Sequence, residues 1–125
     1  MTQLTSDVDK HTALYVEAFN SGDADAVNAM YTEEAVAVWE PGVALTGKAR
    51  IDSVKEFLAA GPKMTAVVRQ SFVTGDTALL IVDWKIDTTD ADGKPEHLTG
   101  VGVDVLRLGT DGHWRYAIDD PYGEK

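Results

Sequence analysis

The first third of the chain carries apolar residues at helical spacing. Val8, Thr12, Tyr15 and Phe19 fall on one stripe, which predicts an amphipathic helix. The pattern Ser6-x-x-Asp9 before this stripe resembles a capping box with Asp in the last place. The segment Asn20-Ser21-Gly22-Asp23 would end the helix, and Asp23 can cap the next one.

A second helix, a short strand and a third helix are predicted to follow. Ala26, Val27, Met30 and Tyr31 give the second helix its apolar face, and the tight connection makes the first two helices a hairpin. Residues 35–39 read as a strand that ends at Glu40-Pro41-Gly42. The third helix begins after Thr46-Gly47 and ends at Gly61-Pro62. Its apolar face would be formed by Ile51, Val54, Phe57 and Leu58.

From Met64 onward the chain reads as four strands joined by tight turns. The predicted strands are 64–73, 78–88, 97–108 and 113–120, and Gly-Asp or Asp-Gly pairs stand between them. Such a series forms an antiparallel meander. We therefore predict a single α+β domain over residues 1–125, with three N-terminal helices packed on one curved sheet.

Side-chain alternation assigns the strand residues to faces. In strand 78–88, Trp84 and the alternate apolar residues face inward. If Leu108 pairs with His113 across a four-residue turn, one face of the last two strands carries polar groups and two glycines, which suits a ligand space. That face holds Gly100, Gly102, Asp104, Leu106, Arg115, Ala117 and Asp119. A turn of three or five residues would exchange the two sets.

The opposite face under this register is too apolar to be left in water, and it resembles a subunit interface. It consists of Val101, Val103, Val105, Trp114, Tyr116 and Ile118. We therefore expect a homodimer that forms through the outer face of the sheet.

Composition and charge narrow the range of functions. The 125 residues include 21 acidic and 11 basic side chains, a net charge of -10, which disfavours nucleic acid and anionic lipid as partners. The absence of cysteine excludes thiolate chemistry, and the three histidines lack metal-ligand spacing, so we expect neither a metal nor another cofactor. The longest apolar runs have five residues and the first residues do not form a signal peptide, so we expect a cytoplasmic protein.

Three side chains could carry chemistry, and each also has a structural interpretation. Asp104 lies in an almost wholly apolar strand, so its carboxyl must be protonated or paired, for example with Arg115 or Arg69. Tyr15 could be a packed core aromatic, and Glu40 a solvated turn carboxylate. Trp39, Trp84 and Tyr31 could form the walls of a ligand pocket or belong to the core.

The order of elements and several segments resemble a known family. The segments are Tyr15-Val16-Glu17-Ala18-Phe19-Asn20-Ser21-Gly22-Asp23, Glu40-Pro41, Val103-Asp104-Val105-Leu106-Arg107-Leu108 and the stretch from His113 to Pro121. Together they resemble the ketosteroid isomerase homologues of the nuclear transport factor 2-like superfamily, which also holds the SnoaL-like polyketide cyclases. The resemblance implies a cone, in which a curved sheet wraps around helices and encloses a pocket, and a dimer through the outer sheet face.

The resemblance also implies roles for three residues. Tyr15 and a protonated Asp104 would form an oxyanion hole, and Glu40 would be the general base if one residue is inserted nearby. The implied activity is a cofactor-independent proton transfer α to the carbonyl of an apolar substrate. Glu40 departs from the family pattern, because it stands where the isomerases have a shorter aspartate.

A second hypothesis keeps the fold and removes the catalysis. The same cone would then be a non-catalytic binding or dimeric assembly module, in which Arg115 and Asp119 fix the polar end of a small ligand. An arginine beside Asp104 would ionise that carboxyl and abolish it as a donor. The two hypotheses therefore differ in the protonation state of Asp104.

Overall fold

A computed structural model describes residues 4–40 and 42–124 of the chain. The helices are α1 (Val8–Ser21), α2 (Ala24–Asn28) and α3 (Gly47–Leu58). The strands are β1 (Tyr31–Glu40), β2 (Val43–Leu45), β3 (Lys63–Thr74), β4 (Thr77–Thr89), β5 (Pro95–Leu108) and β6 (Trp114–Glu124). No helix within this part of the chain is both long and apolar enough to cross a membrane.

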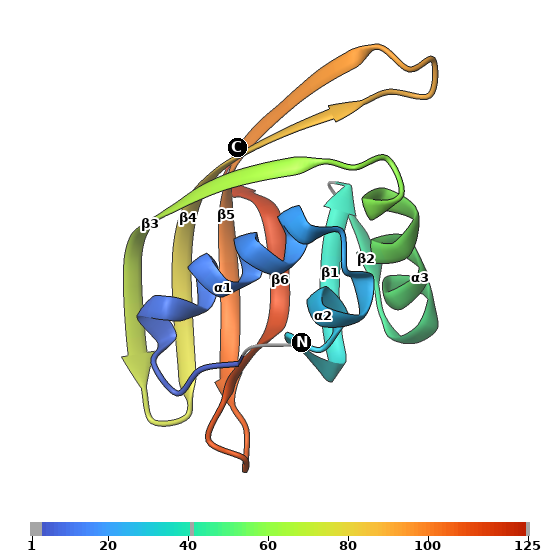
Figure 1. The fold of residues 1–125 in the computed structure, drawn as a ribbon. Helices are drawn as coiled ribbons and strands as arrows, with labels where there is room; N and C mark the ends of the chain where they lie inside the picture. Colours follow the sequence, from blue (N-terminus) through green and yellow to red (C-terminus); the bar gives the residue numbers. More distant parts are fainter. Residues whose placement is uncertain (1–3, 41, 125) are drawn as a thin grey trace.

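The six strands form one curved, unclosed sheet in the order β2-β1-β6-β5-β4-β3. Neighbouring strands run antiparallel except β1 and β6, which are parallel. Helix α1 crosses the concave side of the sheet, with α2 and α3 beside β1 (Figure 1). The far end of the β4–β5 hairpin projects beyond the rest of the molecule (Figure 1). The predicted α+β class and the curved sheet around three helices are confirmed.

The predicted apolar stripe of the first helix is buried against the sheet. Val8, Thr12, Tyr15 and Phe19 are all buried, as is His11. The N-cap is Asp7, whose carboxylate accepts the backbone N–H of Asp9 at 3.0 Å, so the predicted start at Ser6 was one residue early. Gly22 ends the helix in the left-handed region, at φ 78°, where glycine meets no steric penalty.

Tyr31 belongs to β1, so its prediction as part of the second helix was wrong. Helix α2 ends at Asn28, and the Cα of Tyr31 is paired with that of Tyr116 in β6. The backbone N–H of Tyr116 also donates to the carbonyl of Met30 at 2.9 Å. The pairing with β6 overrides the weak helical preference of this short apolar segment.

The predicted register of the last two strands was also wrong. Leu108 pairs with Trp114, not His113, because the turn holds five residues, with the Gly109 N–H bonded to the His113 carbonyl at 2.8 Å. Leu106 pairs with Tyr116 and Val105 with Ile118, so Ala117 is an extra residue in β6, a β-bulge.

The longer turn and the bulge change which side chains share the concave face. Trp114 and Tyr116 lie in the core, with 4% and 3% of their surface exposed, rather than on the outer face as predicted. Beyond the bulge, Asp119 returns to the inner face and pairs with Asp104. Arg115 is left outside this inner set.

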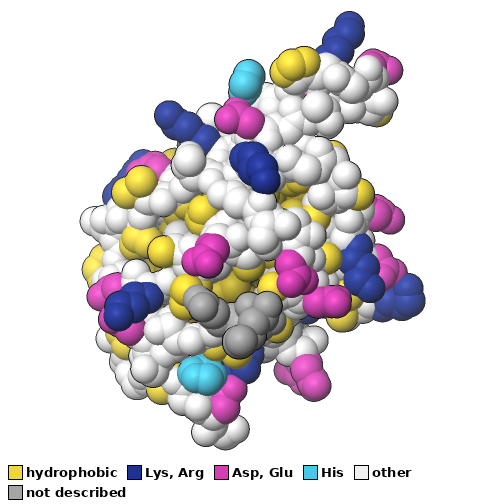
Figure 2. All heavy atoms as spheres, viewed as in Figure 1, with side chains coloured by type: hydrophobic (Ala, Val, Ile, Leu, Met, Phe, Trp, Pro, Cys, Tyr) yellow, Lys and Arg dark blue, Asp and Glu magenta, His cyan; other side chains and the backbone are white. Residues whose placement is uncertain are grey.

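Charged side chains of both signs are dispersed over the face that carries α1 (Figure 2). Lys and Arg side chains are scattered among Asp and Glu on that face, with no continuous stripe of one sign. This arrangement is typical of a solvated surface.

Candidate functional site

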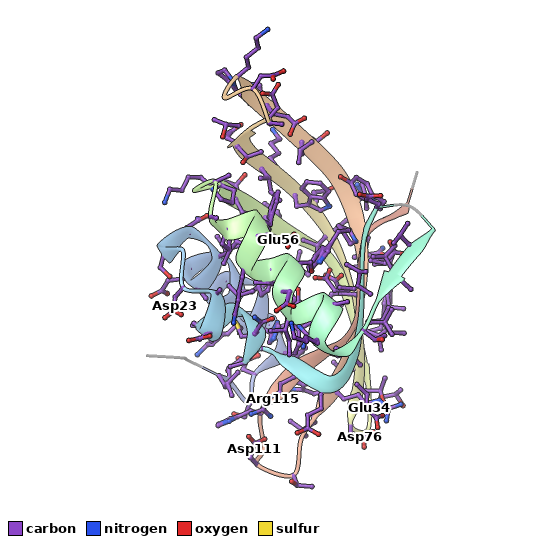
Figure 3. The ribbon with its side chains drawn as sticks, turned by 90° about the vertical axis from the view of Figure 1, so that its right-hand side faces the viewer. Asp23, Glu34, Glu56, Asp76, Asp111 and Arg115 are labelled. Carbon is purple, nitrogen blue, oxygen red and sulfur yellow. The ribbon has the colours of Figure 1, made fainter. Side chains whose placement is uncertain are left out.

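A cavity of about 400 Å³ lies between the helices and the concave face of the sheet. Figure 3 shows α3 in front of the curved sheet, with Glu56 on this helix. The polar or ionisable residues of the lining are Thr12, Tyr15, Ser53, Glu56, Asp104, Tyr116, Asp119 and Tyr122. Most of the remaining wall is aliphatic or aromatic: Phe19, Val27, Trp39, Val54, Phe57, Leu58, Met64, Ala66, Val82, Trp84, Ile86 and Leu98. A space with this composition suits a small apolar molecule that has few polar groups.

Asp104 and Asp119 form a carboxyl pair at this cavity. They occupy opposite positions on β5 and β6, and their side chains are hydrogen-bonded to each other. Only 6% of Asp104 and 7% of Asp119 is exposed. Within the described residues, Oδ1 of Asp104 has no hydrogen-bond partner. The pair therefore presents an unsatisfied oxygen in a buried, mostly apolar environment.

Two tyrosine hydroxyls lead to Asp119. The Tyr31 hydroxyl donates to Oδ2 of Asp119 at 2.5 Å, and the Tyr15 and Tyr31 hydroxyl oxygens are 2.8 Å apart. Because Tyr31 has a single hydroxyl hydrogen, Tyr15 must be the donor in the second bond. Both hydroxyl hydrogens are therefore directed toward the Asp119 carboxylate.

Arg50 contributes a buried positive charge beside Tyr31, the middle residue of this series of hydrogen bonds. Its guanidinium lies 4.5 Å from the centre of the Tyr31 ring and donates to the side-chain oxygen of Asn28 at 3.1 Å. Only 2% of Arg50 is exposed, since it belongs to the buried stripe of α3 with Val54 and Leu58. Burial raises the pKa of the Asp119 carboxyl, and the attraction of this cation opposes that rise.

The surroundings of the two carboxyls differ, and this places the shared proton. Burial raises the pKa of Asp104 well above its usual range, and the neighbouring Asp119 charge raises it further. Burial also raises the pKa of Asp119, but the hydrogen bonds from Asp104 and Tyr31 and the charge of Arg50 act in the opposite direction. The geometry therefore favours a protonated Asp104 that donates to an ionised Asp119.

The structure brings together most of the residues singled out in the sequence. Tyr15, Trp39, Trp84, Asp104 and Asp119 line the cavity. Tyr31 is buried behind Tyr15 and reaches the site through its hydroxyl.

Glu40 and Arg115 lie apart from this group. Glu40 is exposed at the end of β1 and is not among the cavity-lining residues. Arg115 binds Asp111, with Nη2 and Oδ2 2.7 Å apart, and Figure 3 shows both residues far from Glu56. The suggested pairing of Asp104 with Arg115 or Arg69 is not found, because Arg69 binds Asp83. The five-residue turn explains the position of Arg115, since it puts this side chain on the other face of β6.

The two tryptophans that line the cavity, Trp39 and Trp84, are held by hydrogen bonds to the protein. The Trp39 indole N–H donates to the Ser53 hydroxyl at 2.7 Å, and that of Trp84 to the Pro121 carbonyl at 2.8 Å. Gly100 makes room for Trp84, because a Cβ there would lie 2.7 Å from the indole ring. These rings therefore contribute apolar faces to the wall while their N–H groups are already satisfied.

Sequence reasoning missed Arg50 and His11. Arg50 falls four residues before Val54 on the apolar stripe of α3, and that position was the available signal. His11 is fully buried, and its ring meets that of Tyr116 edge-on at a centroid distance of 4.4 Å. Burial lowers the pKa of His11 from 6.5 to about 4, so the ring is neutral at physiological pH. Within the described residues, no group of three or more His, Asp or Glu side chains is placed to hold a metal ion.

The fold resembles those of several solved bacterial proteins. A ketosteroid isomerase-like protein from Erwinia carotovora atroseptica superposes with a TM-score of 0.73 at 23% identity, over 90% of this chain and 89% of that one. A conserved protein from Planctomyces limnophilus gives a TM-score of 0.80 at 15% identity, over 90% and 89%. An NTF2-like protein with a cystatin-like fold from Novosphingobium aromaticivorans gives 0.69 at 19% identity, over 90% and 76%. At these identities the likeness concerns the fold alone.

The sequence itself identifies the family. A search of curated proteins finds no match. The profile of the SnoaL-like domain, in contrast, matches residues 12–117, from within α1 to within β6, and this range includes Tyr15 and Asp104. The chain therefore belongs to the SnoaL-like domain family.

Proposed function

We propose that this protein catalyses a cofactor-independent proton transfer α to the carbonyl group of a small apolar molecule bound in the cavity. The observation that carries this proposal is the buried pair of Asp104 and Asp119, which combines a proton donor with a carboxylate at one place in an apolar wall. Such a pair can supply both an acid and a base.

Asp104 is suited to stabilise the charge that develops during this reaction. A neutral carboxyl donates a hydrogen bond to a carbonyl oxygen, and that bond strengthens as the oxygen becomes an enolate. The apolar surroundings increase the effect, because little water competes for the oxygen. Arg115, which would have ionised Asp104, is engaged with Asp111 instead.

Non-catalytic binding of a small ligand is the second candidate function. It is favoured by the position of Glu40, since the residue that the family resemblance assigns as the base is exposed and outside the cavity lining. The cavity and the carboxyl pair would then serve only to select a neutral ligand with one polar end.

The outer face of the sheet supports association with a second copy of the chain. Val67, Phe72 and Ile118 have exposed fractions of 68%, 57% and 42% on this face, beside the half-buried Val103 and Val105. The same face carries both signs of charge: Arg69, Asp83 and Arg107. A two-fold dimer would cover the apolar side chains and can bring opposite charges together.

Hydrogen exchange with solvent tests the catalytic proposal directly. The protein would be incubated in D₂O with a panel of cyclic ketones and α,β-unsaturated ketones, and mass spectrometry would report deuterium incorporation next to the carbonyl. Catalysed exchange, above that with heat-denatured protein, supports the proposal. Ligands that bind in a thermal-shift assay but undergo no exchange would favour the binding function instead.

A further inference from the structure

The cavity lining limits the groups that can accept a proton from carbon. Among its described residues the carboxyl groups are those of Glu56, Asp104 and Asp119. The surroundings of the pair favour the proton on Asp104. Glu56 is exposed on α3, and within the described part of the chain it has no hydrogen-bond partner that would orient it. Asp119 is buried and fixed by Tyr31 at 2.5 Å, so it is the preorganised acceptor.

We propose that Asp119, rather than Glu40, is the general base of the proton transfer, and that Tyr31 and Tyr15 link its protonation to stabilisation of the substrate oxygen. This inference rests on the proposed function. The shared position of Asp119 and Asp104 at one cavity wall carries it, because it brings the acceptor close to the group that would bind the carbonyl oxygen.

Substrate binding would activate the base. Asp104 donates to Asp119 in the free protein. When a carbonyl oxygen takes this hydrogen bond, Asp119 loses one of its two side-chain donors and becomes more basic. The α C–H bond then breaks, its proton goes to an Asp119 oxygen, and its electron pair forms the C=C bond of an enolate whose charge lies on the oxygen. Asp119 returns the proton to the same carbon or to a conjugated one, which restores the carbonyl.

The hydrogen bonds between Tyr15, Tyr31 and Asp119 couple protonation of the base to stabilisation of the enolate oxygen. While Asp119 is ionised, the hydroxyl hydrogens run from Tyr15 to Tyr31 to Asp119. Once Asp119 is protonated it can itself donate to Tyr31, and both hydroxyls can turn. The Tyr15 hydrogen is then released toward the cavity that Tyr15 lines, where it can donate to the enolate oxygen.

The test compares three candidate bases by the deuterium exchange assay. The variants are Asp119→Asn, Glu40→Gln and Glu56→Gln, with Asp76→Asn as a matched control in an exposed turn (Figure 3). We expect Asp119→Asn to lose exchange by about a hundredfold or more, and Glu40→Gln and Asp76→Asn to stay within about threefold of the native rate. Glu56→Gln alters the cavity wall and should still retain at least about tenfold more exchange than Asp119→Asn. Circular dichroism and thermal unfolding would establish that Asp119→Asn is folded.

A binding measurement supplies a second readout that loss of folding would not imitate. Ionised 2-naphthol imitates an enolate oxygen, and its fluorescence reports binding. Asn at position 119 imitates the neutral, protonated base, so the anion should bind about tenfold more tightly to Asp119→Asn than to the native protein. Unchanged or weaker binding would overturn the assignment.

The outcomes separate the base assignment from the reaction. Exchange that survives in Asp119→Asn, or that is lost in Glu40→Gln or Glu56→Gln, overturns Asp119 as the base and leaves the proposed function standing. Absence of exchange in the native protein overturns both. In Tyr31→Phe we expect exchange to fall about tenfold and the ionisation of the base, seen in the pH–rate profile, to move to higher pH. An unaltered profile would exclude the tyrosine link.

Discussion

Asp104 and Asp119 face each other across β5 and β6, hydrogen-bonded and almost wholly removed from water. Two carboxyls in this position cannot both ionise, so the pair retains a proton where an isolated surface aspartate would have lost it. This relationship joins the strand pairing of the fold to the chemistry that we propose.

The first prediction concerns the donor. Asp104→Asn keeps an N–H that can donate to a carbonyl oxygen, whereas Asp104→Leu keeps none. We expect exchange within about tenfold of native for the first variant and a loss of about a hundredfold or more for the second. The rates would be measured by mass spectrometry at neutral pH, and equal rates in the two variants would show that no hydrogen bond from position 104 is needed.

The second prediction concerns the protonation state itself. Infrared difference spectra between native protein and Asp104→Asn at pH 7 should contain the C=O stretch of a neutral carboxylic acid. The expected cause is burial, reinforced by the charge of Asp119. A spectrum with carboxylate bands alone would remove Asp104 as a donor.

The third prediction concerns stability against pH. His11 has a pKa of about 4 in the folded protein and 6.5 as its reference value, so the unfolded chain binds the proton more tightly. Its stabilising contribution is complete above about pH 6.5 and declines as the pH falls toward 4. By pH 5 the free energy of unfolding should drop by about 2 kcal/mol from this group.

Comparison with His11→Leu isolates this effect from the opposite trend of the buried carboxyls. Their raised pKa values favour the folded protein at low pH, in the native chain and the variant alike. Urea unfolding at pH 8 and pH 5 would give the difference. If the two proteins lose stability in parallel, His11 does not titrate as its burial requires.

The fourth prediction concerns the dimer. Ile118→Asp puts a charge on the outer sheet face and should convert a native dimer into a monomer. Val43→Asp is the matched control, because Val43 has a similar exposure of 44% but lies on the short strand β2. Sedimentation velocity at micromolar concentration would measure both, and a monomeric native protein would contradict the proposed interface.

The fifth prediction concerns the packing of Trp84 against Gly100. A Cβ at Gly100 would lie 2.7 Å from the Trp84 ring, so Gly100→Ala must displace the indole and should destabilise the fold by about 1–3 kcal/mol. Gly102→Ala offers a comparison, since its Cβ would meet Pro121 at 3.4 Å, in ordinary contact. Chemical unfolding followed by tryptophan fluorescence would rank the two variants.

Much of the architecture follows from local patterns. The stripe from Val8 to Phe19 and the alternation of strand 78–88 are strong periodic signals, and both are buried as predicted. Asp104 was recognisable because an ionisable residue interrupts an apolar strand. The high free-energy cost of burying an unpaired carboxylate indicated that this residue must be protonated or paired.

The partners of Asp104 were harder to predict, because they depend on strand register. A change of one residue in the turn exchanges the faces of β6, and the bulge at Ala117 exchanges them again. Ile118 and Asp119 therefore ended on their predicted faces, although the residues between the turn and the bulge did not. The position of Arg115 was predicted wrongly for the same reason. Tyr31 was assigned to the second helix because no residue pattern marks the end of that helix, which lies at Asn28.

The bulge at Ala117 has a consequence for how this site can diverge. Insertion or deletion of one residue at this point would move each following side chain of β6 to the opposite face of the sheet, so Asp119 would no longer face Asp104. Point substitutions that leave the bulge intact would not change which side chains of β6 face the cavity. A change in the number of residues at the bulge can therefore remove the pair of carboxyls from this fold without substituting any side chain of the cavity.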